Sequence, residues 1–172
     1  MGRKIMSGKE IREILKKTAG IIEEEMGLED TVVIGIRRRG AVLADRLKGF
    51  FHGEDVPAGY LDITLYRDDF SSVGAHPVVA GTDVLFNIDD KKVLLVDDVL
   101  FTGRTVRAAL DALVDLGRPA SVRLFVLVDR GNRELPISAD FCGKQVKTSM
   151  NEMVEVKLKE IDGRDDVTVE KR

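Results

Sequence analysis

The chain of 172 residues contains one cysteine, two histidines and no tryptophan. The single Cys142 excludes an intrachain disulfide and any metal site made only of cysteines, and two histidines make a zinc site improbable. Cysteine usage of this kind favours the reducing cytosol, so we expect a cytoplasmic protein. No stretch approaches the roughly 18 uncharged apolar residues of a membrane span. The residues after Met1 are charged, unlike a signal peptide, so neither export nor a membrane partner is expected.

An excess of basic residues is also missing. Lys and Arg number 27 against 30 Asp and Glu, which gives a net charge of −3. Because a surface that neutralises nucleic-acid phosphates normally shows as a basic excess, composition alone predicts no nucleic-acid binding, although a local basic face remains possible. Only three Asn and one Gln accompany the many charged residues, which suggests a thermophilic source.

Repeats and low-complexity tracts are absent, and the length fits one domain with room for a small appended element. Ser7, followed three residues later by Glu10, predicts a capped helix that ends near Gly27. Further helices are expected at 41–47 and 104–116. Strands are expected at 31–36, 58–66, 93–96 and 121–128, with shorter ones at 139–142 and 153–158.

Strands that alternate with helices, and that carry apolar runs of four to eight residues, indicate an α/β fold whose parallel sheet is covered on both faces. The region from Tyr66 to Phe86 interrupts this pattern with a loop that is too long for a simple connection. Loops of this length are usually lids or binding loops, and otherwise disordered excursions.

The most informative segment is VLLVDDVLFTGRT, residues 93–105. In an open parallel sheet, ligands bind beyond the carboxyl ends of the strands, where this strand delivers Asp97 and Asp98. Thr102 to Thr105 then turn into a helix, whose first N–H groups and positive dipole end suit a phosphate. The carboxylates would repel a bare nucleotide, so they must engage sugar hydroxyls or a hydrated magnesium ion shared with the ligand.

Other phosphate motifs do not fit. The chain has no GxxxxGK[ST] loop and no GxGxxG, since Gly103 stands alone. The plain structural alternative is a solvated strand end followed by an ordinary helix cap. A long ordered constellation of apolar, acidic and turn residues favours the functional interpretation.

This segment resembles the phosphoribosyl pyrophosphate (PRPP) motif of type I phosphoribosyltransferases. Residues 62–69, 108–119 and 127–137 are similar to the bifunctional pyrimidine-operon attenuation regulators and uracil phosphoribosyltransferases, and the resemblance covers nearly the whole chain. It implies a type I phosphoribosyltransferase fold in one domain, residues 1–172: a central, mostly parallel sheet flanked by helices. It also implies a flexible lid at about 66–86 and a small hood from about 129 onward that includes the N-terminal segment.

The resemblance also implies roles for individual residues. Asp97 and Asp98 would bind the ribose hydroxyls and metal-bound PRPP, which makes Mg²⁺ the implied cofactor. The 5′-phosphate would be bound by Thr102, Gly103, Arg104 and Thr105. Arg39 and Gly40 match the loop that binds pyrophosphate, although Arg37 and Arg38 stand where family members usually carry Lys-Thr. Arg67, at the root of the lid, would assist catalysis.

Phe101 bears on the choice of base. It stands where related purine-salvage enzymes carry an Asp, which favours a pyrimidine, so the implied reaction converts uracil and PRPP to UMP and pyrophosphate. Asp129 and Arg130 are expected near the base and ribose, unless they merely pair with each other. Two alternatives stay open: a purine or xanthine phosphoribosyltransferase, and a nucleotide-sensing regulator with vestigial catalysis.

Finally, the resemblance implies transcription attenuation through RNA binding, with pyrimidine-operon leader mRNA and UMP or UTP as partners and a homodimer or higher oligomer as the assembly. Lys9, Arg12 and Lys16 form one stripe on the first helix. The expected RNA contacts are Lys16, Lys17, Arg133 and Lys144. Glu10, Glu13 and 23–25 add negative charge to that helix, and Gly20 and Ser138 stand where polar or basic contacts are expected. A charged, solvated helix face is therefore the alternative.

Overall fold

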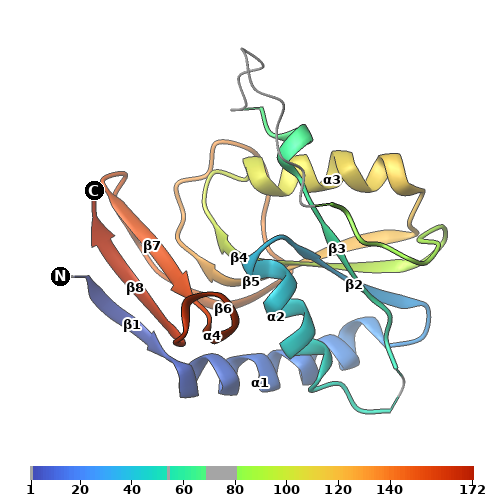
Figure 1. Ribbon diagram of the computed structural model, residues 1–172, viewed down its shortest axis with the longest axis horizontal. Coiled ribbons are helices and arrows are strands. Elements are labelled where there is room, and N and C mark those ends of the chain that lie inside the picture. The colour runs from blue at the N-terminus through green and yellow to red at the C-terminus, as the bar shows by residue number, and fades with distance from the viewer. Residues whose placement is uncertain (1, 54, 69–80) are drawn as a thin grey trace.

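The computed structural model describes residues 2–53, 55–68 and 81–172, which form two sheets (Figure 1). The main sheet has five parallel strands in the order β3-β2-β4-β5-β6, and a smaller antiparallel sheet has the order β1-β8-β7. The main strands are β2 (Thr31–Ile36), β3 (Ala58–Leu61), β4 (Lys92–Leu100), β5 (Ser121–Asp129) and β6 (Phe141–Gln145). The smaller sheet contains β1 (Arg3–Ser7), β7 (Glu152–Lys157) and β8 (Asp166–Lys171).

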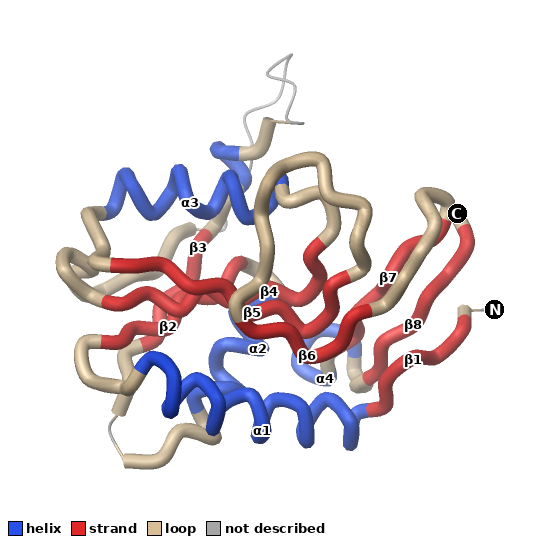
Figure 2. The backbone as a smooth tube through the Cα atoms, turned by 180° about the vertical axis from the view of Figure 1, so that it is seen from behind, coloured by secondary structure: helices blue, strands red, loops and turns tan. Residues whose placement is uncertain are grey.

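Helices cover both faces of the main sheet, as Figure 2 shows. The helices α1 (Gly8–Met26) and α2 (Arg39–Lys48) lie on one face and α3 (Arg104–Leu116) on the other. Along β4, Leu94 and Val96 belong to the core under α1 and α2, whereas Val93 and Leu95 belong to the core under α3. Both faces of β4 are therefore buried, which explains its continuous apolar run and confirms the predicted α/β layers.

The first helix begins as the sequence predicts. Glu10 donates its backbone N–H to Ser7 Oγ at 3.3 Å, and Ser7 donates its own backbone N–H to Glu10 Oε2 at 2.7 Å. This reciprocal pair satisfies N–H groups that the helix itself cannot. The span of α3 is also confirmed, and Gly117 follows it.

Several boundaries differ from prediction; β6, expected at 139–142, covers Phe141–Gln145. The strand β4 does not stop before the acid pair, because its ladder with β5 continues until Leu100 meets Asp129. The strand β3 ends early: Asp62 accepts from the backbone N–H and the hydroxyl of Thr64, which starts the short 3₁₀ helix Thr64–Tyr66. The helix α2 starts two residues earlier than expected.

We call the small sheet together with α4 (Lys159–Asp162) the hood. Its apolar residues Met6, Val154, Val156, Val167 and Val169 join the core under α1 and α2. The strand β6, which lies within the expected hood from about residue 129 onward, pairs with β5 in the main sheet. The sequence interpretation also missed β1 and β8.

Of the expected lid, residues 69–80 lie outside the part of the chain that the structure describes. The described ends of that region contact the main body: Tyr60 and Asp83 exchange backbone hydrogen bonds of 2.8 and 2.9 Å. Within the described residues, no helix is both long enough and apolar enough to cross a membrane.

Candidate active site

A cleft lies at the carboxyl end of the main sheet. Its first part is a cavity of about 280 Å³ lined by residues 36–39, 62–64, 97–99, Arg67 and Thr105. It brings the expected pyrophosphate loop and the acid pair together with the root of the expected lid. These groups are far apart in the chain, and they meet because β2, β3 and β4 are parallel neighbours.

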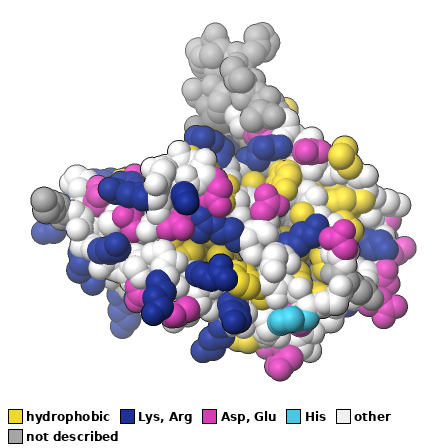
Figure 3. Space-filling model, turned by 60° about the horizontal axis from the view of Figure 1, so that its bottom comes forward, with side chains coloured by type: hydrophobic (Ala, Val, Ile, Leu, Met, Phe, Trp, Pro, Cys, Tyr) yellow, Lys and Arg dark blue, Asp and Glu magenta, His cyan; other side chains and the backbone are white. Residues whose placement is uncertain are grey.

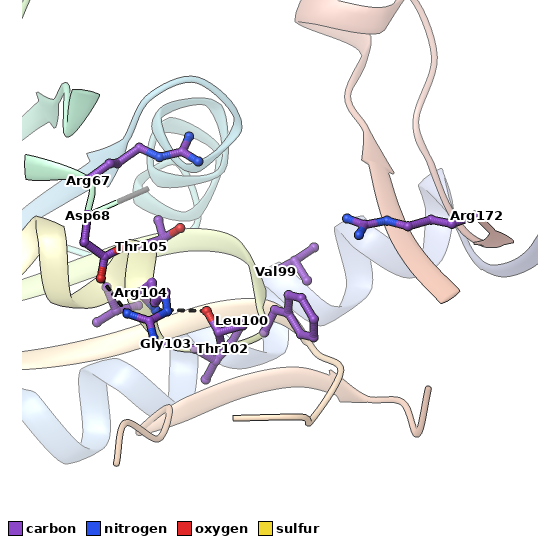
Figure 4. A pocket seen from close by; sticks show the side chains of 11 residues that line it. Arg67, Asp68, Val99, Leu100, Thr102, Gly103, Arg104, Thr105 and Arg172 are labelled. Carbon is purple, nitrogen blue, oxygen red and sulfur yellow. Dashed lines mark hydrogen bonds and ion pairs between the residues drawn. The ribbon is translucent and has the colours of Figure 1, made fainter. Parts of the chain in front are cut away.

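The second part is a cavity of about 340 Å³ (Figure 4). It is lined by Arg67, Asp68, residues 99–106 and Arg172. Because Arg67, Val99 and Thr105 line both cavities, the two parts form one cleft. Along this cleft the arginine-rich loop, the acid pair and the phosphate turn follow one another.

Asp97 and Asp98 occupy different environments within β4. Asp97 is only 6% exposed, and its Oδ1 accepts the backbone N–H of Asp98 at 2.9 Å. Burial, reinforced by the negative charge of Asp98, raises the pKa of Asp97 well above its ordinary value. Cations or hydroxyl donors at this position would stabilise the charged form.

The donor set fits magnesium only together with a ligand. Among the described residues, no three His, Cys, Asp or Glu side chains cluster as a metal site would require. Mg²⁺ in phosphate-binding enzymes is commonly held by one or two carboxylates plus phosphate oxygens and water. Two adjacent carboxylates at the mouth of a phosphate cleft satisfy that chemistry.

The phosphate turn connects β4 to α3. Gly103 has a φ of 93°, and a Cβ there would meet Ile137 Cβ at 3.3 Å. Arg104 donates its backbone N–H to Thr102 Oγ1 at 3.2 Å, while the Thr102 carbonyl accepts from Glu134 and Leu135 at 2.9 and 3.0 Å. The turn is therefore held by the following loop, and it presents the N-terminus of a 13-residue helix to the cavity.

The Arg104 side chain points away from the turn to other partners. Its Nη1 donates to Asp68 at 2.6 Å and its Nε to Glu134 at 2.8 Å, so its guanidinium joins α3 to the lid root and to the loop after β5. Arg107 reinforces the same junction by donating to the Tyr66 carbonyl at 3.1 Å. The backbone of Arg104, rather than its guanidinium, belongs to the turn.

The arginine-rich loop lies across the cleft from the turn. The Arg37-Arg38 peptide bond is cis. Arg37 donates to the Gly81 carbonyl at 2.9 Å, and Arg39 pairs with Asp162 of the hood at 2.8 Å. A Cβ on Gly40 would meet the Val96 carbonyl oxygen at 2.4 Å, so the start of α2 packs directly against the backbone of β4. The loop thus presents its backbone beside the acid pair.

Phe101 and Arg130 meet at the other end of the cleft. The Arg130 guanidinium lies 3.8 Å from the centre of the Phe101 ring and donates to Thr148 Oγ1 and the Ser149 carbonyl at 3.1 and 3.0 Å. Asp129 pairs with Arg133 at 2.7 Å. The alternative that Asp129 and Arg130 merely pair with each other is therefore wrong.

The residues expected to bind RNA do not form one free surface. Arg133 donates to Ile137, Phe101 and Asp129, so its guanidinium holds the loop after β5 together. Lys144 donates to the Ile5 carbonyl at 2.8 Å. Lys16 and Lys17 are exposed on α1, and Lys17 lines a groove of about 260 Å³ with Lys144.

Sequence reasoning missed Arg172 in the cleft, Asp162 beside the arginine-rich loop, and the anchors Asp68 and Glu134 of Arg104. The alternating residues Val167, Thr168 and Val169 carry a strand signal that could have located β8, and with it Arg172. The partners of Arg104 carry no comparable local pattern.

Comparison with known proteins agrees with this geometry. The phosphoribosyl transferase domain family matches residues 4–160. The chain is 55% identical over 171 residues to Bifunctional protein PyrR of Chloroflexus aurantiacus, covering 97% of this chain and 94% of that protein. It is 54% identical over 165 residues to the Deinococcus radiodurans protein of the same name, covering 94% of this chain and 90% of that protein.

Solved structures agree in fold. A hypoxanthine-guanine phosphoribosyltransferase from Bacillus anthracis aligns over 96% of this chain and 95% of its own with a TM-score of 0.72 and 23% identity. A hypoxanthine phosphoribosyltransferase from Staphylococcus aureus aligns over 96% of this chain and 90% of its own, with a TM-score of 0.74 and 19% sequence identity. The expected type I phosphoribosyltransferase fold is confirmed, and the chain belongs to the phosphoribosyl transferase domain family and, within it, to the PyrR proteins.

Proposed function

We propose that the chain transfers the phosphoribosyl group of PRPP to uracil, and that it also attenuates transcription of pyrimidine genes by binding leader mRNA. The observation that carries the first activity is the single cleft in which residues 36–39, the acid pair and the phosphate turn follow one another. Membership of the PyrR proteins, which are named bifunctional, supports two activities in one chain.

The reaction needs opposite charges at the two ends of the breaking bond. The uracil N1 electron pair forms a bond to the anomeric carbon while the carbon–oxygen bond breaks toward pyrophosphate, and the N1 proton is released. Asp97 and Asp98 would bind the ribose hydroxyls and lie beside the ring as it becomes positive. Asp97 and Asp98 would hold Mg²⁺ together with oxygens of PRPP, and the metal would supply positive charge near the leaving group.

The remaining groups orient the substrate. Thr102, Gly103, Thr105 and the backbone of Arg104 would hold the 5′-phosphate at the start of α3, and the backbone from Arg37 to Gly40 would receive pyrophosphate. Arg67 lies between the two parts of the cleft, where a lid built on residues 66–86 would exclude water. We place this activity in the cytosol, on the evidence of the single cysteine.

The base would lie against the ring of Phe101, which also stacks with the Arg130 guanidinium. Phe101 has no group that exchanges a proton with a purine ring nitrogen, which supports a pyrimidine acceptor over hypoxanthine, guanine or xanthine. Assays of base consumption with PRPP and Mg²⁺ test this directly. Hypoxanthine or guanine reacting faster than uracil would identify a purine enzyme, and UMP binding without turnover would identify a regulator with vestigial catalysis.

The RNA-binding face would be built from Lys16 and Lys17 of α1 and Lys144 of β6, with Lys9 and Arg12 beside them. Figure 3 shows the side of the molecule on which α1 lies, where Lys and Arg side chains stand among acidic ones. We leave Arg133 out of this face because its guanidinium is used inside the loop. A homodimer would double the basic surface presented to a folded RNA.

A titration of pyrimidine-operon leader RNA against a scrambled RNA, each with and without UMP, tests the regulatory half. We expect tighter binding to leader RNA, and tighter still with UMP, because one assembly would couple both sites. Equal affinity for the two RNAs would leave an enzyme without this regulatory role.

A further inference from the structure

One side chain from the hood enters the second part of the cleft. Arg172 follows β8, and its backbone N–H donates to the Asn151 carbonyl at 2.8 Å, beside the paired residues Glu152 and Lys171. The β7-β8 hairpin therefore determines where the side chain begins. In Figure 4 Arg172 lies on the opposite side of the cavity from the residues of β4 and α3, and its side chain extends toward Val99 of β4.

The part of the cleft that Arg172 approaches is apolar. Val99, Leu100 and Phe101 line it, immediately before the phosphate turn begins at Thr102. A flat base fits against such a surface, whereas a phosphate requires the N–H groups of the turn. Because Arg172 lines the same cavity and extends toward Val99, its position points toward the base of a bound nucleotide.

Arg172 differs from its neighbour Arg130 in how its donors are used. Burial and, after it, the positive charge of Arg172 lower the pKa of Arg130, so the two cations act on each other. The Nε and Nη2 groups of Arg130 donate to Thr148 Oγ1 and to the Ser149 carbonyl. Arg172, in contrast, forms no ion pair with any carboxylate in the described part of the chain.

An arginine side chain has five N–H donors and no acceptor. Uracil presents carbonyl oxygens at C2 and C4, whereas cytosine has an amino group at C4, which would set donors against donors. We propose that Arg172 donates a hydrogen bond to the C4 carbonyl oxygen of uracil and thereby selects uracil over cytosine, whose C2 carbonyl is the same. This inference rests on the proposed transferase activity, and it adds a specificity residue that comes from the hood.

The test compares Arg172→Met with the unmodified chain in steady-state assays that vary uracil, cytosine and PRPP separately. We expect kcat/KM for uracil to fall by roughly 10- to 100-fold, the loss of one hydrogen bond from a charged donor, mainly through a higher KM. The KM for PRPP should stay within about twofold. The preference for uracil over cytosine should narrow, because cytosine loses an unfavourable contact rather than a favourable one.

Two further variants sharpen the result. Arg172→Lys keeps a charged donor and should recover part of the uracil activity. Lys171→Met removes the same charge from the exposed preceding residue, which does not line the cavity, and should leave both KM values unchanged.

The outcomes separate this inference from the proposed function. If the unmodified chain transfers no pyrimidine, the proposed function is wrong, and the role of Arg172 is wrong with it. If the chain does transfer uracil while Arg172→Met leaves the uracil KM unchanged or raises only the PRPP KM, the assignment to the base alone is wrong.

Discussion

The main sheet and the hood hold their parts of the cleft in different ways. In the main sheet, backbone meets backbone: a Cβ on Gly35 would meet the Gly40 carbonyl oxygen at 2.5 Å, and one on Gly40 would meet that of Val96 at 2.4 Å. The hood shares the core under α1 and α2, but beside the cleft it is joined to the same region by charged side chains, with Arg39 paired to Asp162 and Arg46 to Glu160 and Asp165.

This difference suggests that the main sheet holds the reacting groups rigidly, whereas the hood affects stability and selectivity. Close backbone packing leaves the acid pair and the arginine-rich loop little freedom to move, as a reaction centre requires. Ion pairs between partly exposed side chains are weaker and depend on pH and salt. We therefore expect changes in the main sheet to abolish the reaction, and changes at the hood to alter stability or selectivity by smaller amounts.

The largest effect should follow from changing the acid pair. Asp97→Asn or Asp98→Asn removes negative charge beside the ribose, and we expect UMP formation to fall by at least about a hundredfold. Circular dichroism should show the fold intact. Asp90→Asn is the matched control, since exposed Asp90 precedes β4 at its opposite end and its φ of 61° is one that Asn tolerates. Full activity in both acid-pair variants would contradict the assignment.

The next effect concerns the packing of α2 on β4. Gly40→Ala forces a methyl group against the Val96 carbonyl, so we expect a loss of about 1–3 kcal/mol in the free energy of unfolding, together with a loss of activity. Urea denaturation measures the first and UMP formation the second. Gly20→Ala in the middle of α1 is the control, because its Cβ would meet nothing within 4 Å. It should stabilise the protein by about 0.5–1 kcal/mol.

The same contrast decides what could be predicted from the sequence. The segment 93–105 carries the acid pair and phosphate turn as one continuous pattern, so its residues can be assigned from the sequence alone. The arginine-rich loop can be located in the same way, but the partners of its side chains, such as Asp162 for Arg39, come from a distant part of the chain. No local period or motif indicates such a pair.

The hood was hard to predict for a physical reason. Its strands β1 and β8 are short and bury only one face, so they lack the continuous apolar run that marks β4. The loop after β5 misled the interpretation in another way: Arg133 looks like a surface cation in the sequence, but Asp129 and two carbonyl groups use its donors.

The ion-pair part of the hood's attachment should contribute less and should depend on pH. Arg46→Met removes the pairs to Glu160 and Asp165, and we expect it to cost about 1–2 kcal/mol near neutral pH. Hydrogen bonds from Arg46 lower the pKa of Glu160 below its ordinary value of 4.5. The contribution of that pair is therefore complete above this value and is lost as pH falls through the lowered pKa.

Urea denaturation of Arg46→Met and the unmodified chain across this pH range checks the sign: the difference should shrink in acid. Lys48→Met is a suitable control on the same helix, since its partner Asp55 is 93% exposed and that pair should contribute little. A difference between the Arg46 variant and the unmodified chain that grows in acid would contradict the ion-pair attachment.

The smallest expected effect lies on the outer face of α1, away from the cleft. Lys16 is exposed, and if it contacts an RNA phosphate, Lys16→Ala should reduce the slope of log affinity against log salt by close to one unit. Uracil turnover should not change. Lys91, paired with Asp30 before β4, offers a control of equal charge, and Lys91→Ala should leave the slope unaltered. Filter binding of leader RNA at several salt concentrations measures both slopes, and an equal slope for Lys16→Ala and the unmodified chain would remove Lys16 from the RNA-binding face.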